Sequence, residues 1–293
     1  MTFRDYLKQE ARFVDAELDR LVPPETSPPA TIHRAMRYSL FAGGKRIRPI
    51  LCLEAARAVS DAAPAVERAA CALEMVHTYS LIHDDLPALD NDDFRRGRPT
   101  CHKQFGEAMA ILAGDALLTL AFQVLSRMPG PDGRGALLVE ELATAAGTPG
   151  GMVAGQVEDL EGEGKTATAE LLEAIHHAKT GALLVASVRL GAICAGAAAP
   201  QLAALTRYGR HVGLAFQIVD DVLDVEQSSA ALGKTAGKDA QQKKITFPAV
   251  YGLEASKRMA EEERRGAHAA LEVFGERAGR LRELADFIVQ RSA

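Results

Sequence analysis

One segment constrains the fold more than any other, because it places carboxylates along a helix that is otherwise apolar. Residues 213–225 read GLAFQIVDDVLDV, and outside its polar positions the segment holds only Gly, Ala, Leu, Ile, Val and Phe. On a helix the polar positions fall within an arc of about 100°. They are Gln217, Asp220, Asp221 and Asp224. Burying charge without a partner is costly, so this stripe must face something polar inside the protein.

The three aspartates of this stripe indicate a bound cation. Carboxylates roughly 6 Å apart repel one another by about 3 kcal/mol per pair at an effective dielectric constant of about 20. A divalent cation would relieve that repulsion. Ligands that are all oxygen, without His or Cys, favour Mg²⁺, Mn²⁺ or Ca²⁺ over Zn²⁺.

A second acidic cluster lies in residues 81–99, LIHDDLPALDNDDFRRGRP, where Asp84, Asp85 and Asp90 follow an apolar segment. The spacing from Asp84 to Asp90 is not a helical repeat, so Pro87 must help to bend the chain if both are to meet one metal ion. The run lacks the mid-loop Gly and terminal Glu of an EF-hand. A solvated helix end explains either acidic cluster alone equally well. Two such clusters, each closing an apolar helix, favour a metal site.

Basic residues recur where a phosphate ligand would need them. In residues 43–49, GGKRIRP, Gly43 and Gly44 permit close approach of the backbone to a ligand. Arg48 can grip a phosphate with two hydrogen bonds, while Lys45 acts as a point charge. The other basic positions of this kind are Arg95, Arg96, Lys179 next to Thr180, and the run Lys234, Lys238 and Lys244. A solvated basic face explains any one of them about as well as a ligand does.

Helical periodicity dominates the chain, and we find no convincing pair of strands joined by a hairpin turn. Aromatic residues make up 5% of the 293 residues and Trp is absent, so the core must be built mainly from Ala, Leu, Val and Ile on closely packed helices. We predict an all-α protein with a single large domain spanning residues 1–293. The predicted helices lie near residues 2–22, 29–42, 46–60, 63–86, 106–127, 135–146, 168–196, 201–226, 247–265 and 266–290.

Charge and cysteine usage bear on partners and location. The net charge of -5 offers no basic face for nucleic acid or an anionic membrane. The four cysteines have no Cys-x-x-Cys spacing, which is typical of inert thiols in a reducing compartment. The N-terminal segment lacks an apolar signal core, and the apolar stretch 181–200 carries Arg189, so we expect a buried core helix there. We predict a cytoplasmic protein without a stable membrane anchor.

Together these motifs resemble the trans-isoprenyl diphosphate synthases, and in particular the bacterial farnesyl diphosphate synthases. The first acidic motif matches as DDLPALD followed by RRG, and the second as FQIVDDVLD. The other matches, in family order, are GGKRIRP, GDALL (114–118), GQVEDL (155–160), KTGALL (179–184) and GKTAGKDAQQKKITFP (233–248). The likeness covers nearly the whole chain. One departure is Phe247, where the family often has Tyr.

The resemblance implies helices arranged around a deep central cavity, usually in a homodimer, and three Mg²⁺ ions (or Mn²⁺) on an allylic diphosphate. The metal ligands would be Asp84, Asp85, Asp90 and Asp220, and less directly Asp221 and Asp224. The catalytic contacts to the allylic substrate would come from Lys179, Thr180 and Gln217, and further binding contacts from Arg95 and Lys234. Isopentenyl diphosphate would meet Lys45, Arg48, His77 and Arg96, with Gly44 and Lys244 as further phosphate-binding positions.

The implied chemistry fits these residue types. Metal ions and cationic side chains stabilise the departing diphosphate and leave an allylic carbocation. The isopentenyl double bond attacks this cation, and a proton is then lost to the departing diphosphate. Water would quench the cation, so the site must close, and the polar segment 233–244 is the expected lid.

Product length is expected to be set near Tyr79 and Ser80, five and four residues before Asp84. The growing chain points away from the diphosphate, so side chains one turn below the metal site meet its tail. Helical spacing puts Ser80 under Asp84 and leaves Tyr79 on the flank. By resemblance, an aromatic residue here typifies bacterial farnesyl synthases, which predicts a fifteen-carbon product. The alternative role for Tyr79 is ordinary core packing. Separately, the alternative product is the twenty-carbon geranylgeranyl diphosphate.

Two further functions share this fold class. A class I terpene cyclase normally carries an Asn/Ser/Glu metal motif second and lacks an isopentenyl-binding loop, whereas this chain has a second aspartate motif and GGKRIRP. A non-catalytic partner subunit would have a broken motif, and both motifs are intact here. The farnesyl synthase interpretation therefore ranks first.

Overall fold

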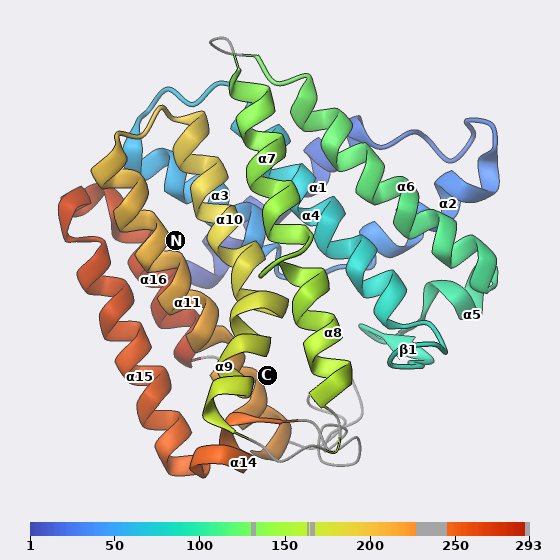
Figure 1. Ribbon diagram of the computed structural model, residues 1–293. Coiled ribbons are helices and arrows are strands. Elements are labelled where there is room, and N and C mark those ends of the chain that lie inside the picture. Colours follow the sequence, from blue (N-terminus) through green and yellow to red (C-terminus); the bar gives the residue numbers. More distant parts are fainter. Residues whose placement is uncertain (130–132, 163, 165–167, 227–244, 291–293) are drawn as a thin grey trace. The chain divides into compact units, whose positions relative to one another are not determined.

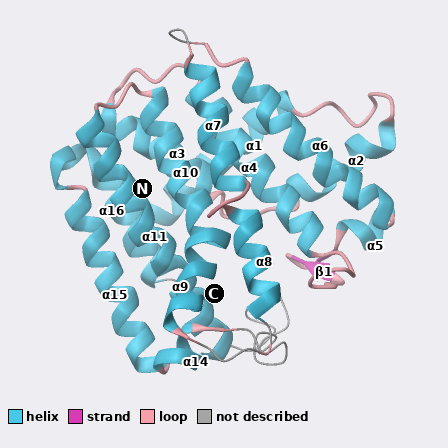
Figure 2. Cartoon of the chain, in the orientation of Figure 1, coloured by secondary structure: helices cyan, strands magenta, loops and turns pink. Residues whose placement is uncertain are grey.

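A computed structural model describes residues 1–129, 133–162, 164, 168–226 and 245–290. These residues are helical almost throughout (Figure 2), which confirms the all-α class. The chain divides into two compact units, one of residues 1–50 and 64–139 and the other of residues 51–63 and 140–293. That residues 1–293 act as a single domain stays a prediction.

The first unit is built around helix α4. Its elements are α1 (Phe3–Leu21), α2 (Ala30–Leu40), α4 (Val66–Asp84), β1 (Phe94–Arg95), β2 (Arg98–Pro99), α5 (Cys101–Phe105) and α6 (Glu107–Ser126). α3 (Ile47–Val59) and α7 (Arg134–Ala146) each run from this unit into the second. Residues of α4 are buried on all sides, as expected of a helix that is apolar all round.

Helices α4 and α6 lie side by side (Figure 1), and a glycine permits their close approach. A methyl group at Gly114 would lie 2.2 Å from Nε2 of His83. The same ring nitrogen is 3.0 Å from the carbonyl oxygen of Ile111. The His83 ring in turn meets the ring of Tyr79 edge-on, with centroids 5.6 Å apart. Gly114 therefore fixes the position of His83, and His83 borders Tyr79.

The second unit is centred on the long helix α11 (Ala199–Glu226), which packs against α10, α15 and α16. Its other elements are α8 (Met152–Gly162), α9 (Ala169–His176), η1 (His177–Gly181), α10 (Ala182–Cys194), α14 (Phe247–Tyr251), α15 (Leu253–Ala270), η2 (Glu272–Ala278) and α16 (Gly279–Gln290). A buried apolar cluster joins Leu172, Ile218 and Phe247 from three of these helices. Most of α10 is buried, which confirms the core helix expected in the apolar stretch.

The structure corrects several predicted elements. A two-residue hairpin, β1 paired antiparallel with β2, was not expected, because such short strands show no alternation. Helix α8 was also not expected. The predicted helix 168–196 contains the π-helical turn η1. The predicted helix 247–265 breaks at Gly252, whose φ is +81°, and the predicted helix 266–290 is divided among the end of α15, η2 and α16. A left-handed backbone at Gly252 ends α14 and lets α15 begin.

Among the described residues, one helix, α6, is long and apolar enough to cross a membrane, by length and composition alone. The core helix of a soluble protein shares these two properties.

Candidate active site

The first aspartate motif forms a turn at the end of α4. The backbone N–H of Asp90 donates to the carbonyl oxygen of Asp84 at 2.8 Å, and that of Asp92 donates to the carbonyl of Asp85 at 3.2 Å. Exposed Pro87 lies at the tip between them. The chain therefore bends as the spacing requires, and the backbones of the two outer aspartates of the motif become neighbours.

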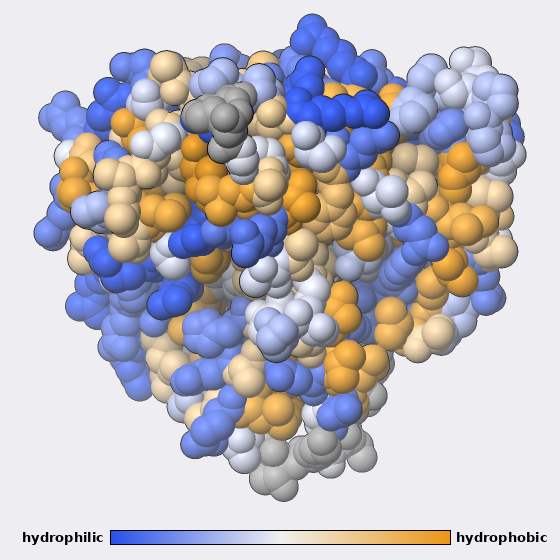
Figure 3. Space-filling model, turned by 45° about the horizontal axis from the view of Figure 1, so that its top comes forward, coloured by the Kyte–Doolittle hydropathy of each residue, from blue (hydrophilic) through white to orange (hydrophobic). Residues whose placement is uncertain are grey.

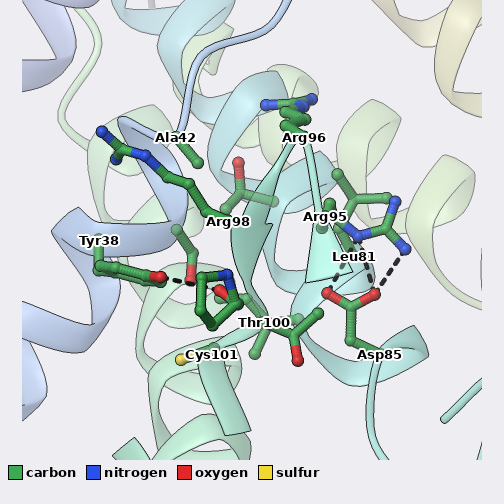
Figure 4. Close-up of a pocket in the computed structure, with 13 residues that line it drawn as sticks. Tyr38, Ala42, Leu81, Asp85, Arg95, Arg96, Arg98, Thr100 and Cys101 are labelled. Carbon is green, nitrogen blue, oxygen red and sulfur yellow. Dashed lines mark hydrogen bonds and ion pairs between the residues drawn. The ribbon is translucent and has the colours of Figure 1, made fainter. Parts of the chain in front are cut away.

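Asp85, the middle aspartate, is held by an arginine (Figure 4). Arg95 donates from Nε to both carboxylate oxygens at 2.8 and 3.0 Å, and its Nη2 lies 2.6 Å from Oδ1. Burial raises the pKa of Asp85, although Arg95 acts in the opposite direction. Asp85 is 3% exposed, whereas Asp84 and Asp90 are only partly buried. The outer two aspartates are thus better placed than Asp85 to reach an incoming metal ion.

Arg95 and Arg96 line a small pocket of about 30 Å³ (Figure 4). Asp85, Tyr38 and Cys101 also line it. Arg96 leaves the hairpin to bond the carbonyl oxygen of Gly43.

A glycine in GGKRIRP accommodates that arginine. Gly44 has a φ of +131°, and a methyl group there would lie 2.7 Å from Nη1 of Arg96. Only glycine tolerates both the left-handed backbone and the contact. The structure therefore brings the RRG segment against GGKRIRP, two basic motifs that are far apart in sequence.

Within GGKRIRP, Arg46 is turned into the protein. Its side chain is 1% exposed and donates to Asp15 at 2.8 Å, to Glu74 at 2.7 Å and to the carbonyl of Leu40 at 2.7 Å. Its φ of +50° is a left-handed conformation that a non-glycine residue rarely adopts. Arg46 therefore anchors the loop, while Lys45 is exposed and Arg48 is partly buried. Composition alone did not separate these three roles.

The electrostatics around GGKRIRP and the RRG segment suit an anionic ligand. The pKa of His77 lies well below its ordinary value, because the ring is buried and because Arg48, Arg96, Arg95 and Arg46 surround it with positive charge. A group that feels four arginines sits in a cationic region. His77 is accordingly neutral at physiological pH and can bond a diphosphate oxygen only through an N–H.

In the second unit, Lys179 and Thr180 lie on η1, a π-helical turn. Such turns recur at functional sites because they displace a side chain from the regular helix. Lys179 Nζ is 2.6 Å from Oδ2 of Asp159. A methyl group at Gly155 would lie 2.1 Å from the backbone nitrogen of Lys179. Gly155 and Asp159 belong to the GQVEDL motif, so this motif packs against η1 and pairs with Lys179. The sequence analysis did not assign this role.

Hydrogen bonds connect Thr180 to Gln217 and Gln217 to Asp221 in the second aspartate motif. Thr180 Oγ1 donates to Gln217 Oε1 at 2.9 Å, and Gln217 Nε2 donates to Asp221 Oδ1 at 3.2 Å. The backbone N–H of Phe247 donates to Asp221 Oδ2 at 2.9 Å. Asp221 is 3% exposed, and Asp224 is also buried, whereas Asp220 is partly buried. Asp220 is therefore the aspartate of this motif best placed to meet a metal ion.

The remaining predicted residues are placed as follows. Tyr79 is buried on α4, and Ser80 donates from Oγ to the carbonyl of His77 at 2.9 Å. Lys234 and Lys244, like the expected lid at 233–244, lie outside the described residues.

The metal assignment stays a prediction. Within the described ranges, no group of three or more His, Cys, Asp or Glu side chains is arranged to hold a metal ion. The donor set nevertheless suits Mg²⁺, since it consists of carboxylate oxygens and the turn brings Asp84 beside Asp90.

The family model described as polyprenyl synthetase matches residues 29–279. Farnesyl diphosphate synthase of Geobacillus stearothermophilus is 50% identical over 260 residues, covering 88% of this chain and 87% of its own. The heterodimeric geranylgeranyl pyrophosphate synthase large subunit 1 of Arabidopsis thaliana is 48% identical over 297 residues, covering 99% and 79%.

Solved structures agree in fold. An FPP/GFPP synthase of Zymomonas mobilis superposes with a TM-score of 0.87 at 36% identity, covering 98% of both chains. A geranyltransferase of Legionella pneumophila gives a TM-score of 0.88 at 35% identity, covering 99% of this chain and 96% of its own. Proteins named for different product lengths thus match at similar identity.

Proposed function

Because this chain belongs to the polyprenyl synthetase family, whose enzymes are prenyltransferases of isoprenoid biosynthesis, we propose that it is a farnesyl diphosphate synthase. It condenses isopentenyl diphosphate with dimethylallyl diphosphate and then with the resulting geranyl diphosphate. The observation that carries the product length is the buried ring of Tyr79, five residues before Asp84 on α4. Burial raises the pKa of Tyr79, and the charge of Asp84 adds to that shift, which supports a position of the ring close below the motif.

The residues divide the work between two diphosphates. Lys45, Arg48 and Arg96 bind isopentenyl diphosphate, with neutral His77 as a hydrogen-bond donor. Arg95, Lys179, Thr180 and Gln217 position the allylic diphosphate. Magnesium ions bound by Asp84 and Asp90, or by Asp220, would stabilise the charge of the departing diphosphate.

The chain supplies no nucleophile in this mechanism. The allylic C–O bond breaks and leaves its electron pair on the diphosphate, and the isopentenyl double bond then forms the new C–C bond with the carbocation. The departing diphosphate accepts the proton that is lost. The basic side chains hold both substrates in register and keep water from the cation.

We also propose a homodimer and a cytoplasmic location. Ile111 and Leu112 on α6 are 44% and 53% exposed, and apolar side chains that face solvent on a helix support a covered surface. Orange apolar patches among blue polar ones are visible on the face in Figure 3. All four cysteines are buried free thiols, which supports a reducing compartment.

Product analysis tests the proposal. The purified protein is incubated with dimethylallyl diphosphate, isopentenyl diphosphate and Mg²⁺, and the products are identified by mass after dephosphorylation. We expect farnesol as the main alcohol. A main product of twenty carbons would replace the proposal with a geranylgeranyl synthase, the second candidate that the 48% identical relative favours. Diphosphate release without isopentenyl diphosphate would indicate a cyclase.

A further inference from the structure

Asp221 joins three separate segments of the second unit. Its carboxylate is 3% exposed, and both oxygens face protein groups. Oδ1 accepts from Gln217 on the same helix, and Oδ2 accepts from the backbone N–H of Phe247 at 2.9 Å. Nε2 of His176 lies 3.5 Å from Oδ2. This aspartate therefore ties α11 to the start of α14, and it approaches the end of α9.

His176 is the residue of this group that no motif assigned. It is 7% exposed, and its ring stacks on the ring of Phe247, with centroids 5.3 Å apart and planes 16° apart. Phe247 stacks on Tyr251 in turn, at 5.9 Å. Among the described residues, Nε2 of His176 has no hydrogen-bond partner, and Asp221 is the carboxylate beside it. A buried imidazole nitrogen that faces a carboxylate across 3.5 Å needs only a small shift to bond it.

The position of His176 in the chain connects this contact to the residues predicted to bind the allylic substrate. His176 is the last residue of α9, and the next residue begins η1, which carries Lys179 and Thr180. One connection from η1 to Asp221 runs through Thr180 and Gln217. The other runs through His176. On the far side of Asp221, Phe247 N–H lies in the first turn of α14, where amides have no intrahelical acceptor.

We propose that His176 is a positioning residue, which through Asp221 and Phe247 holds the η1 turn and α14 in one fixed arrangement around the allylic substrate. The inference rests on the proposed function, because η1 carries the catalytic contacts to that substrate. His176 touches neither substrate. Its loss lets η1 shift relative to α14, which weakens allylic binding and admits water to the carbocation.

The test compares His176→Phe, which keeps a ring but removes the nitrogen, with His177→Gln, a change at the exposed neighbour. For His176→Phe we expect the KM for geranyl diphosphate to rise roughly tenfold and the fraction of geraniol formed by water capture to rise. The KM for isopentenyl diphosphate should stay within about twofold. The His177→Gln variant should match the wild type in all three quantities.

A double-mutant cycle separates positioning from general destabilisation. If His176 acts through Asp221, the effects of His176→Phe and Asp221→Asn on the geranyl diphosphate KM are strongly non-additive. Additive effects, or unchanged geraniol and allylic KM in a folded His176→Phe, would overturn the inference. Should His176→Phe not fold, His176→Gln takes its place in the same cycle, with the same two outcomes. A wild-type enzyme that makes no farnesyl product would instead reject the proposed function.

Discussion

The backbone N–H of Asp90 donates a 2.8 Å hydrogen bond to the carbonyl oxygen of Asp84. These two residues are six positions apart, a spacing that no regular helix brings together. The turn around Pro87 does so by ending α4 and folding the chain back on itself. The turn therefore brings the backbones of the two outer aspartates of the motif together, as a shared metal ion would require.

Removing a metal ligand should stop the reaction and leave the fold intact. For Asp84→Ala, Asp90→Ala and Asp220→Ala we expect turnover to fall at least about a hundredfold. The melting temperature should hold or rise, because each change also removes like-charge repulsion. Steady-state product formation and thermal melts measure the two effects. Asp93→Ala, an exposed aspartate paired with Lys103, is the matched control and should keep its activity. Activity above a few per cent in any of the three would refute the metal assignment.

Lys45→Ala and Arg48→Ala should weaken binding of isopentenyl diphosphate selectively. Loss of a charge-assisted hydrogen bond costs about 1.5–3 kcal/mol, or roughly ten- to a hundredfold in KM. The KM for the allylic substrate should change far less. Initial rates with each substrate varied in turn give both constants. Lys8→Ala on α1, an exposed lysine outside the site, serves as the control. Equal changes in both constants would place these residues in the other half of the site.

Arg46 should affect stability rather than substrate contact. Arg46→Met leaves Glu74 buried without its cation, which should lower the free energy of unfolding by about 3–5 kcal/mol. In the double variant Arg46→Met, Glu74→Met the loss should be smaller, because no buried charge is left behind. Urea denaturation of the three proteins measures this. A double variant no more stable than Arg46→Met alone would show that the unpaired Glu74 carboxylate does not cause the loss of stability.

Histidine 77 should contribute to the acid sensitivity of the protein. Its pKa is lowered in the folded state, so below about 6.5, the ordinary His value, the unfolded chain binds more protons and stability falls as pH falls. His77→Asn should flatten the decrease in unfolding free energy between about pH 6.5 and 5. Denaturation series at several pH values measure the slope. An unchanged slope would mean that His77 titrates alike in both states.

Shortening Tyr79 should lengthen the product. A bulky ring would block a fourth isoprene unit, so Tyr79→Ala or Tyr79→Met should shift the main product from fifteen to twenty carbons or more. Mass analysis of the dephosphorylated products decides this. A folded variant that still stops at fifteen carbons would leave Tyr79 as core packing. Leu73→Ala, at a fully buried position six residues before Tyr79 on the same helix, controls for a cavity elsewhere in the core.

The sequence alone predicted most of the long helices and the two acidic helix ends, because apolar periodicity and breakers are local signals. It missed α8 and the break at Gly252. Residue type alone could not separate Arg46 from Lys45 and Arg48, and only the family resemblance singled out the latter two. The physical difference lies in a left-handed backbone at Arg46 and in Glu74, a residue of another helix. The sequence also predicted Asp221 as a metal ligand, because it lies in the polar stripe of residues 213–225. Its burial against Phe247 depends on a residue that follows 26 positions later in the chain, beyond any helical pattern.

Gly114 has a consequence for protein engineering. A methyl group there would push His83, and His83 meets the ring of Tyr79 edge-on. The side-chain volume at position 114 therefore acts on His83, which contacts the ring that we propose sets product length. A directed-evolution library that shrinks residue 79 should vary residue 114 in the same clones, since a smaller side chain at 79 opens the space into which His83 could retreat.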